Sequence, residues 1–282
     1  MANFTQIGLD LQSVLKRTYA NLLYQSSFYK FLNESYIGEV RRTGSPVIEI
    51  IKQQPTTINV RADAEIATAV TPALVTYGQT IVNLTELPMD YSFRVPVTVT
   101  GSNIANALQG QIDVNDSEMA IKIDTYGFNK LANATGVATK QWAFTTNDEA
   151  IGLINELKAT LFNNKVYDSY RLGLDAIEHG KLVSAITSVL KFETMAGVEG
   201  VDRGEVGRAY GVDIFAINSS VLTNQEKGYF GSPVACVGDA FFTDMVEYDG
   251  NYPGFPGYYV IEGNVLFGAE VVRPEAIIKL TA

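Results

Sequence analysis

The stretch Val47-Ile-Glu-Ile-Ile-Lys52, extended by Thr57-Ile-Asn-Val60, decides how the fold of this chain is read. Thr80-Ile-Val-Asn-Leu-Thr-Glu-Leu87 can return antiparallel to it, after a tip of small and polar residues over 61–72. The pattern predicts a long β-hairpin that opens at Pro46. A two-stranded arm cannot bury both of its faces and is marginal in water on its own. We therefore expect the hairpin to lie on a neighbouring molecule, which favours an assembly protein over an enzyme.

The composition indicates a folded protein with a sizeable core. The chain has 282 residues, of which 46% are hydrophobic and 18% charged, enough for one large domain or two ordinary ones. Its apolar stretches are short and interrupted by charges, and its first residues lack the pattern of a signal peptide. A single cysteine excludes an intrachain disulfide framework and indicates a reducing cytosol.

The formal net charge of −10 argues against tight binding of nucleic acid, because proteins that grip phosphates carry a basic face. An acidic surface could still line a container for nucleic acid. We therefore expect contact with double-stranded DNA to be weak and without sequence preference.

Three segments are predicted to contain helices. Residues 7–33 have apolar positions at helical spacing and end in Phe28 and Phe31. A second helix is predicted to run to about residue 134 from a cap at Asn115 or Asp116. A third is predicted to start at a cap at Asn147, with Asp148 and Glu149 in its first turn. The predicted buried positions of the last two are Met119, Ile123, Tyr126, Leu131, Ala150, Leu153, Ile154, Leu157 and Leu161.

Short strands recur in the rest of the chain, so the predicted class is α+β. Residues 91–99 alternate apolar and polar side chains, and Pro96 favours an edge position there. Asp239 follows a strand and is predicted to open a short helix. The other predicted strands are 212–217, 233–237, 258–261, 265–267 and 276–280.

Side chains for catalysis are scarce. His179 is the only histidine, and no nucleophile motif surrounds it, which favours a structural role. Cys236 lies in an apolar run and is interpreted as a small core residue. One histidine and one cysteine leave no ordinary zinc site. We expect no enzymatic activity, no metal and no cofactor.

Three weaker patterns have simpler explanations than a ligand site. The acidic clusters at 113–118 and 247–251 match no EF-hand loop, and the first is explained as a helix start. The glycines between 200 and 211 fit no phosphate-binding motif. The aromatic loop 248–259 could stack on sugars, as in a carbohydrate-binding or carbohydrate-active protein, or could form an interface. We favour the interface, because aromatic residues are enriched at interfaces.

Four stretches, in this order, carry a resemblance to a known family. They are Glu39-Val-Arg-Arg-Thr-Gly-Ser-Pro-Val-Ile-Glu-Ile50, Leu84-Thr-Glu-Leu-Pro-Met-Asp-Tyr-Ser-Phe-Arg-Val95, Gly204-Glu-Val-Gly-Arg-Ala-Tyr-Gly-Val-Asp-Ile214 and Val265-Leu-Phe-Gly-Ala-Glu-Val-Val-Arg-Pro-Glu-Ala-Ile277. The chain resembles the major capsid proteins of tailed bacteriophages, which have the Hong Kong 97-type shell fold. The likeness is an order of elements from about residue 8 to residue 280, and none of the four stretches is a catalytic fingerprint.

The resemblance implies five parts of the chain. Residues 1–45 would be an N-terminal arm and 46–87 the extended loop. Residues 88–137 would form a peripheral domain with a long spine helix, and 138–261 an axial domain. Residues 262–282 would be C-terminal strands that return to the peripheral domain.

The resemblance also implies a function. The chain would assemble with itself as pentamers and hexamers into an icosahedral shell that encloses phage DNA, in a virion built in the cytoplasm of a bacterial host. A portal is an implied partner, and so is a separate scaffold protein, because the chain begins close to the arm. An encapsulin-like compartment, which shares the fold, stays an alternative. Lys52, the only lysine of the extended loop, lies near its base, which argues against a covalent crosslink.

The tip of the hairpin is the predicted contact with a neighbouring subunit. Its small residues suit a close approach, and its charged residues can pair across an interface. A mobile surface loop is the alternative. The predicted contact residues are Arg61, Asp63, Glu65, Ile66, Val70 and Pro72.

Overall fold

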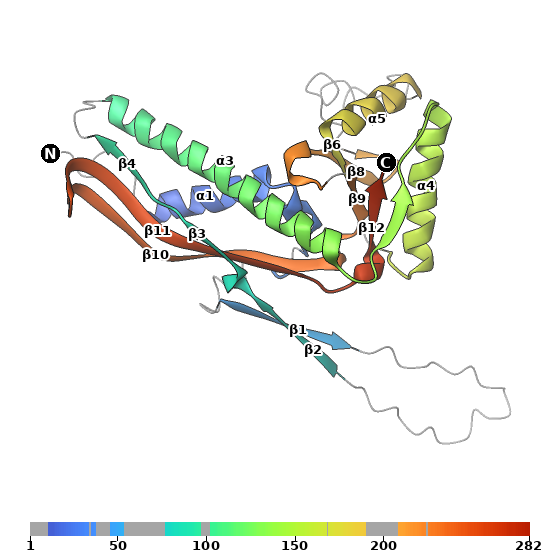
Figure 1. The fold of residues 1–282 in the computed structure, drawn as a ribbon, viewed down its shortest axis with the longest axis horizontal. Coiled ribbons are helices and arrows are strands. Elements are labelled where there is room, and N and C mark those ends of the chain that lie inside the picture. The colour runs from blue at the N-terminus through green and yellow to red at the C-terminus, as the bar shows by residue number, and fades with distance from the viewer. Residues whose placement is uncertain are drawn as a thin grey trace.

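Two larger β-sheets account for most of the described strands, and one long helix, α3 (Ser102–Asn133), runs along one sheet to the other (Figure 1). The computed structural model describes residues 11–33, 35–37, 46–53, 77–96, 102–167, 169–189, 208–223 and 225–282. No helix in these ranges is long and apolar enough to cross a membrane. The mixture of helices and strands confirms the predicted α+β class.

The four-stranded sheet is built on one long antiparallel pair, β10 and β11. It extends along the long axis of the molecule, beside α3 (Figure 1). β3 and β4 pair with β11 one after the other along its second edge. The bounds are β3 (Leu87–Asp90), β4 (Phe93–Pro96), β10 (Cys236–Tyr252) and β11 (Phe255–Val271).

The six-stranded sheet lies at one end of α3 and has the order β5-β12-β9-β6-β8-β7. Two helices pack beside it, α4 (Asn147–Asn163) and α5 (Ala176–Val189). α4 begins with a capping box, in which Thr146 and Glu149 each accept a backbone hydrogen bond from the other. The strands are β5 (Ala138–Gln141), β6 (Tyr170–Asp175), β7 (Arg208–Ala209), β8 (Val212–Ile217), β9 (Glu226–Gly231) and β12 (Ile277–Thr281).

The N-terminal segment packs into the body of the protein. It consists of α1 (Leu11–Gln25) and the short 3-10 helix η2 (Phe28–Phe31). α1 contacts α3 and β10, and η2 contacts α3. Val14 and Leu22 of α1 are buried in the main core together with the aromatic residues of η2.

Aromatic rings from η2 join the two sheets through α3. Phe28 contacts Phe128 of α3 and Phe267 of β11, with ring centroids 5.7 and 6.4 Å apart. Phe31 contacts Phe128 and also Phe215 of β8, at 6.3 and 5.4 Å. These five residues are called the aromatic joint. Because β11 and β8 belong to different sheets, the aromatic joint is the place where the two sheets share one core.

Three buried aspartates hold the N-terminal segment in place. Asp124 of α3 accepts hydrogen bonds from the hydroxyl of Ser26 and from the backbone N–H groups of Ser27 and Phe28, at 2.5, 3.0 and 2.9 Å. Burial raises the pKa of Asp124, and these hydrogen bonds oppose the increase. The carboxylate therefore binds the N–H groups at the start of η2 that the short helix leaves without partners.

The other two aspartates bind hydroxyl and amide groups of the same segment. Asp239 of β10 accepts hydrogen bonds from the hydroxyls of Tyr19 and Tyr29, at 2.9 and 3.4 Å. Asp116 of α3 accepts one from Asn21 at 2.6 Å and one from Tyr91 at 3.2 Å. Each aspartate thus connects parts of the chain that lie far apart in the sequence.

The structure corrects three sequence predictions about where helices start. α3 begins at Ser102, so Asn115 and Asp116 lie inside the helix and cap nothing. Asp239 lies within β10, where a short helix was predicted. The cap of α4 is Thr146, one residue before the predicted Asn147. In the first two cases the acidic residue lies in a regular element, and its carboxylate has a distant partner.

Most predicted core positions are confirmed. Met119, Ile123 and Leu131 are buried on α3, and Tyr126 is half-buried. On α4 four of the five predicted positions are buried, and Leu153 is half-buried. The predicted strand 212–217 is β8, with the same bounds. Pro96 ends β4, a strand at the sheet edge, as expected.

The strands after residue 235 are distributed differently from the predicted division of the chain. The predicted boundary between residues 261 and 262 falls inside β11, which is one continuous strand of the four-stranded sheet. β12 was expected to return to the part that contains the long helix. It lies instead in the six-stranded sheet, between β5 and β9.

Gly127 of α3 is predicted to be intolerant of a side chain. A Cβ atom at this position would lie 2.3 Å from the ring of Phe28, which is fixed in the aromatic joint. We expect Gly127→Ala to lower the free energy of unfolding by about 1–3 kcal/mol, as overpacking does. Gly110→Ala is the matched control on the same helix, because a Cβ atom there would meet nothing within 4 Å. It should stabilise by about 0.5–1 kcal/mol. Equal effects of the two changes in urea unfolding would contradict this account.

Asp124→Ala should destabilise the subunit far more than Asp113→Ala. Both aspartates connect α3 to the N-terminal segment, but Asp113 pairs with Arg17 at the surface, at 2.9 Å. The exposed pair contributes about 0–1 kcal/mol. Loss of Asp124 leaves buried donors without an acceptor, at about 1–3 kcal/mol for each group. Thermal unfolding of both variants measures the difference, and similar losses would show that the buried carboxylate is not an anchor.

Candidate assembly surface

The predicted hairpin is present, and it extends away from both sheets (Figure 1). β1 (Val47–Gln53) and β2 (Tyr77–Asn83) pair antiparallel, from Val47 opposite Asn83 to Gln53 opposite Tyr77. They form a two-stranded sheet of their own. This confirms the base of the hairpin that the sequence predicts.

The base of the hairpin is held by the body of the protein. One face of the base packs against β10 and the end of β11, in a small cluster separate from the main core. At the opposite face Ile81 is 54% exposed, although it is a large aliphatic residue in a strand. The cluster consists of Ile48, Ile50, Val82, Leu84, Val237 and Val272.

The base is fixed closely against β11. The N–H of Leu84 donates to the carbonyl of Pro46 at 2.9 Å, which closes the hairpin at its root. A Cβ atom at Gly268 would lie 2.0 Å from the carbonyl oxygen of Asn83. The backbones can approach this closely only because residue 268 is a glycine.

A polar cluster ties the root of the hairpin to the long helix. Glu86, in the turn η4 (Leu84–Glu86) that follows β2, pairs with Lys130 of α3 at 2.6 Å and accepts a hydrogen bond from the hydroxyl of Tyr126. Lys130 also pairs with Glu270 of β11 at 3.6 Å. These four residues are called the latch. They join the hairpin, α3 and the four-stranded sheet at one point.

The charges of the latch stabilise one another. The hydrogen bond from Lys130 is the main cause that lowers the pKa of Glu86. Burial and the hydrogen bond to Glu86 raise the pKa of Tyr126 to about 12. The pKa of Lys130 is raised by Glu86, although burial acts in the opposite direction. At neutral pH the latch is therefore an ion pair with a neutral tyrosine beside it.

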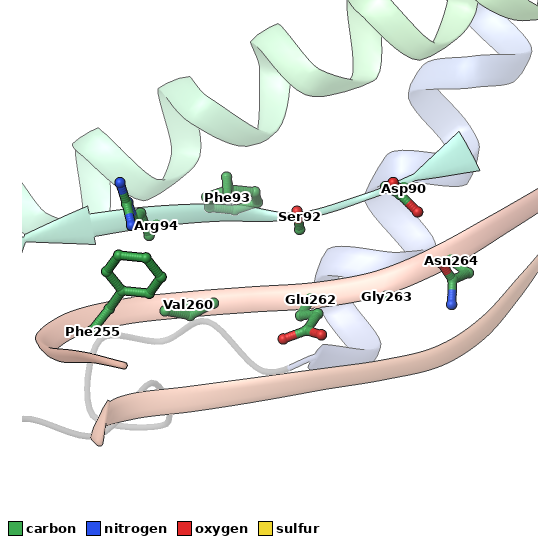
Figure 2. A pocket seen from close by; sticks show the side chains of 9 residues that line it. All are labelled: Asp90, Ser92, Phe93, Arg94, Phe255, Val260, Glu262, Gly263 and Asn264. Atoms are coloured by element: carbon green, nitrogen blue, oxygen red, sulfur yellow. The ribbon is translucent and has the colours of Figure 1, made fainter. Parts of the chain in front are cut away.

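A shallow pocket lies on the four-stranded sheet, between the end of β3, the start of β4 and the neighbouring part of β11 (Figure 2). Asp90, Glu262 and Asn264 lie toward one end of it, and Arg94 lies over the ring of Phe255 at the other, 4.0 Å from its centroid. The guanidinium of Arg94 also lies 5.4 Å from the ring of Tyr258. Polar and apolar side chains line the pocket in similar measure, and no histidine or cysteine lies among its lining residues.

The structure places the aromatic loop 248–259, a candidate for sugar binding, within the four-stranded sheet. Residues 248–259 form the closed end of the β10–β11 pair. Arg94 covers one face of Phe255 through a cation–π contact, while 43% of Phe255 stays exposed.

The predicted contact residues at the hairpin tip lie outside the described residues. Arg61, Asp63, Glu65, Ile66, Val70 and Pro72 all fall between the described ends of β1 and β2. Lys52 lies in β1, opposite Gly78 of β2. The tip contact stays a prediction.

Few side chains in the described part of the chain could take part in catalysis. Cys236 is fully buried, and burial raises the pKa of its thiol to about 12, which suits a small core residue. His179 is buried on α5, and its Nε2 has no hydrogen-bond partner among the described residues. Within the described ranges no three His, Cys, Asp or Glu side chains are grouped to hold a metal ion.

Sequence reasoning missed the residues of the latch and the buried aspartates. Glu86 and Lys130 lie 44 positions apart, and charged residues of either kind are usually solvated, so no local pattern marks them. Asp116 and Asp124 leave a faint signal. Both fall on the apolar stripe of α3, in register with Ile112, Ala120 and Phe128. An acid inside an apolar stripe indicates a buried hydrogen-bonding partner.

Solved structures with a similar fold include the capsids of tailed phages. A structure from Mycobacterium phage Che8 has a TM-score of 0.62 at 19% identity and covers 91% of each chain. The capsid structure of cyanophage P-SCSP1u has a TM-score of 0.58 at 14% identity and covers 84% of each chain. The virus-like particle from Pyrococcus furiosus has a TM-score of 0.50 at 11% identity, covering 95% of this chain and 98% of that one.

No protein-family model matches the chain, and no curated protein matches its sequence. The relationship is therefore visible in the structure alone. It shows the fold, and it confirms the Hong Kong 97-type shell fold that the sequence resemblance implied.

Lys130→Met should loosen the root of the hairpin with little loss of overall stability. The side chains of Lys130 and Glu86 are about one-third exposed, so their ion pair contributes no more than about 1 kcal/mol. We expect faster amide hydrogen exchange over residues 80–87. Lys140→Met is the control, since Lys140 pairs with Glu156 at 2.5 Å in a different part of the protein. If the amide groups of residues 80–87 exchange in Lys130→Met as slowly as in the wild type, the latch does not hold the root of the hairpin.

Proposed function

We propose that this chain, which has the fold of tailed-phage capsid proteins, is a major capsid protein that assembles with itself into a closed icosahedral shell around phage DNA. The observation that carries the proposal is the hairpin of β1 and β2. The body covers one face of its root, and the exposed Ile81 lies on the other face. A neighbouring copy of the chain supplies the missing cover.

The proposed parts of the subunit follow the two sheets. The peripheral domain consists of α3 and the four-stranded sheet, and the axial domain of the six-stranded sheet with α4 and α5. The hairpin is the extended loop, and its tip, residues 61–72, is the proposed contact with an adjacent subunit. Pentamers and hexamers form around the axial domain.

The proposed partners follow from this function. They are other copies of the chain, a portal, and a separate scaffold protein during assembly in the bacterial cytoplasm. Packaged double-stranded DNA contacts the shell weakly, because a net charge of −10 leaves little surplus for phosphate. The shell has no enzymatic role in this proposal.

An encapsulin-like compartment is the second candidate, supported by the likeness to the virus-like particle from Pyrococcus furiosus. This likeness has a lower TM-score than those to the phage structures. The contents of purified particles distinguish the two candidates: genomic DNA supports the phage capsid, and an enzyme cargo supports the compartment.

Deletion of residues 62–70 should abolish or weaken shells and leave a folded subunit. The deleted residues lie beyond the described strands of the hairpin, so the axial sheet should keep near-normal thermal unfolding. Arg61→Glu should be milder, because a pair at the rim of an interface contributes about 0–1 kcal/mol. Sedimentation after co-expression with the scaffold measures both variants. Normal, heat-stable shells from the deletion variant would show that the tip makes no docking contact.

A further inference from the structure

We infer that His179 is an acid-sensitive switch on the buried face of helix α5. It is the only histidine of the chain. At this position protonation would place a positive charge on a buried side chain whose Nε2 has no hydrogen-bond partner among the described residues. The inference concerns a property of the folded subunit, and it does not depend on the proposed function.

His179 lies on the face of α5 that packs on the six-stranded sheet. Its side chain is 8% exposed, and Leu182 and Ile186, three and seven residues further on, continue the same buried face. The imidazole Nε2 has no hydrogen-bond partner among the described residues. A buried imidazole with a free ring nitrogen is stable when neutral, whereas the charged form loses its hydration.

The positive charge of Lys30 in η2 also disfavours protonation of His179. Its ammonium group lies 4.6 Å from the centre of the Phe215 ring of β8, within the aromatic joint. Arg171 of β6 donates a hydrogen bond to the backbone carbonyl of Lys30. Burial is the main cause that lowers the pKa of His179, and the charge of Lys30 lowers it further.

The acids near the start of α5 are engaged with other groups. Asp175 accepts hydrogen bonds from the N–H groups of Ile177 and Glu178, as a helix cap does. Glu178 pairs with Lys181 at 2.8 Å and with Lys227 of β9 at 3.5 Å. Neither acid contributes to the pKa of His179.

The remaining elements packed on α5 also direct their charges elsewhere. On α4, Lys158 donates to the carbonyl of Tyr210 and Glu156 pairs with Lys140. On β8, Asp213 pairs with Arg208. Each of these described carboxylates is thus engaged with another group, and the N-terminal end of α5 adds its own positive potential.

The direction of the pH effect follows from linkage. The native state binds the imidazole proton less tightly than the unfolded state, so stability is complete above the ordinary histidine pKa of about 6.5. It decreases as the pH falls from there toward the lowered native pKa. Each pKa unit by which the native state lowers the pKa of His179 corresponds to a tenfold change in the equilibrium for opening the structure around α5.

The test uses the intact subunit and needs no assembly. The single histidine, labelled with ¹³C, gives one imidazole signal whose titration reports its pKa directly. We expect a value below 6.5, and Lys30→Met should raise it toward that value. Lys181→Met is the control: it removes a positive charge from the same helix but one that contacts Glu178, so it should not raise the pKa.

Hydrogen exchange shows which part of the subunit opens when His179 is protonated. In the wild-type subunit, exchange of residues 176–189 at pH 5.5, corrected for the intrinsic rate, should exceed that at pH 7.5. His179→Phe, which cannot be protonated, should abolish the difference. A pKa of His179 at or above 6.5, or an equal acid response in His179→Phe, would overturn the inference. If His179→Phe folds poorly, the titration of the wild-type imidazole alone still tests whether the pKa of His179 is lowered.

Discussion

The aromatic joint holds the two sheets of this protein in one body. Phe28 and Phe31 of the N-terminal segment contact Phe128 of α3, and through it they bring β11 of one sheet and β8 of the other into a common core. Buried aromatic contacts of this kind need defined ring positions. Asp124 supplies them, because its carboxylate binds the backbone at the start of η2. The position of the long helix relative to both sheets depends on this small region.

A second constraint follows from the first. The two sheets and α3 form one body, and the root of the hairpin attaches to it through an apolar cluster and the latch. An isolated two-stranded sheet is marginal in water. The fold therefore combines a body with its own core and an extension that, in our proposal, gains its stability from another molecule. That combination suits a subunit of a closed shell, where every copy both gives and receives such a contact.

The sequence allowed the class, the hairpin and most core positions to be predicted, because these depend on local periodicity. Two of the errors share one physical cause. Asp116 and Asp239 resemble helix caps in their local sequence, yet their partners Asn21 and Tyr19 lie 95 and 220 residues away. The residues of the latch were not predicted for the same reason. A hydrogen bond between distant residues produces no periodic pattern in a single sequence. The pairing of β12 with β5 and β9 also joins distant parts of the chain, so the sequence does not show which sheet β12 belongs to.

The most direct test of the central claim is a cryo-electron microscopy reconstruction of particles assembled from the purified chain with its scaffold. The account predicts closed icosahedral shells in which the β1–β2 hairpin of each subunit lies on an adjacent subunit, with Ile81 covered at that contact. Absence of closed particles under every assembly condition would contradict it. So would shells in which the hairpin projects into solvent and touches no neighbouring chain.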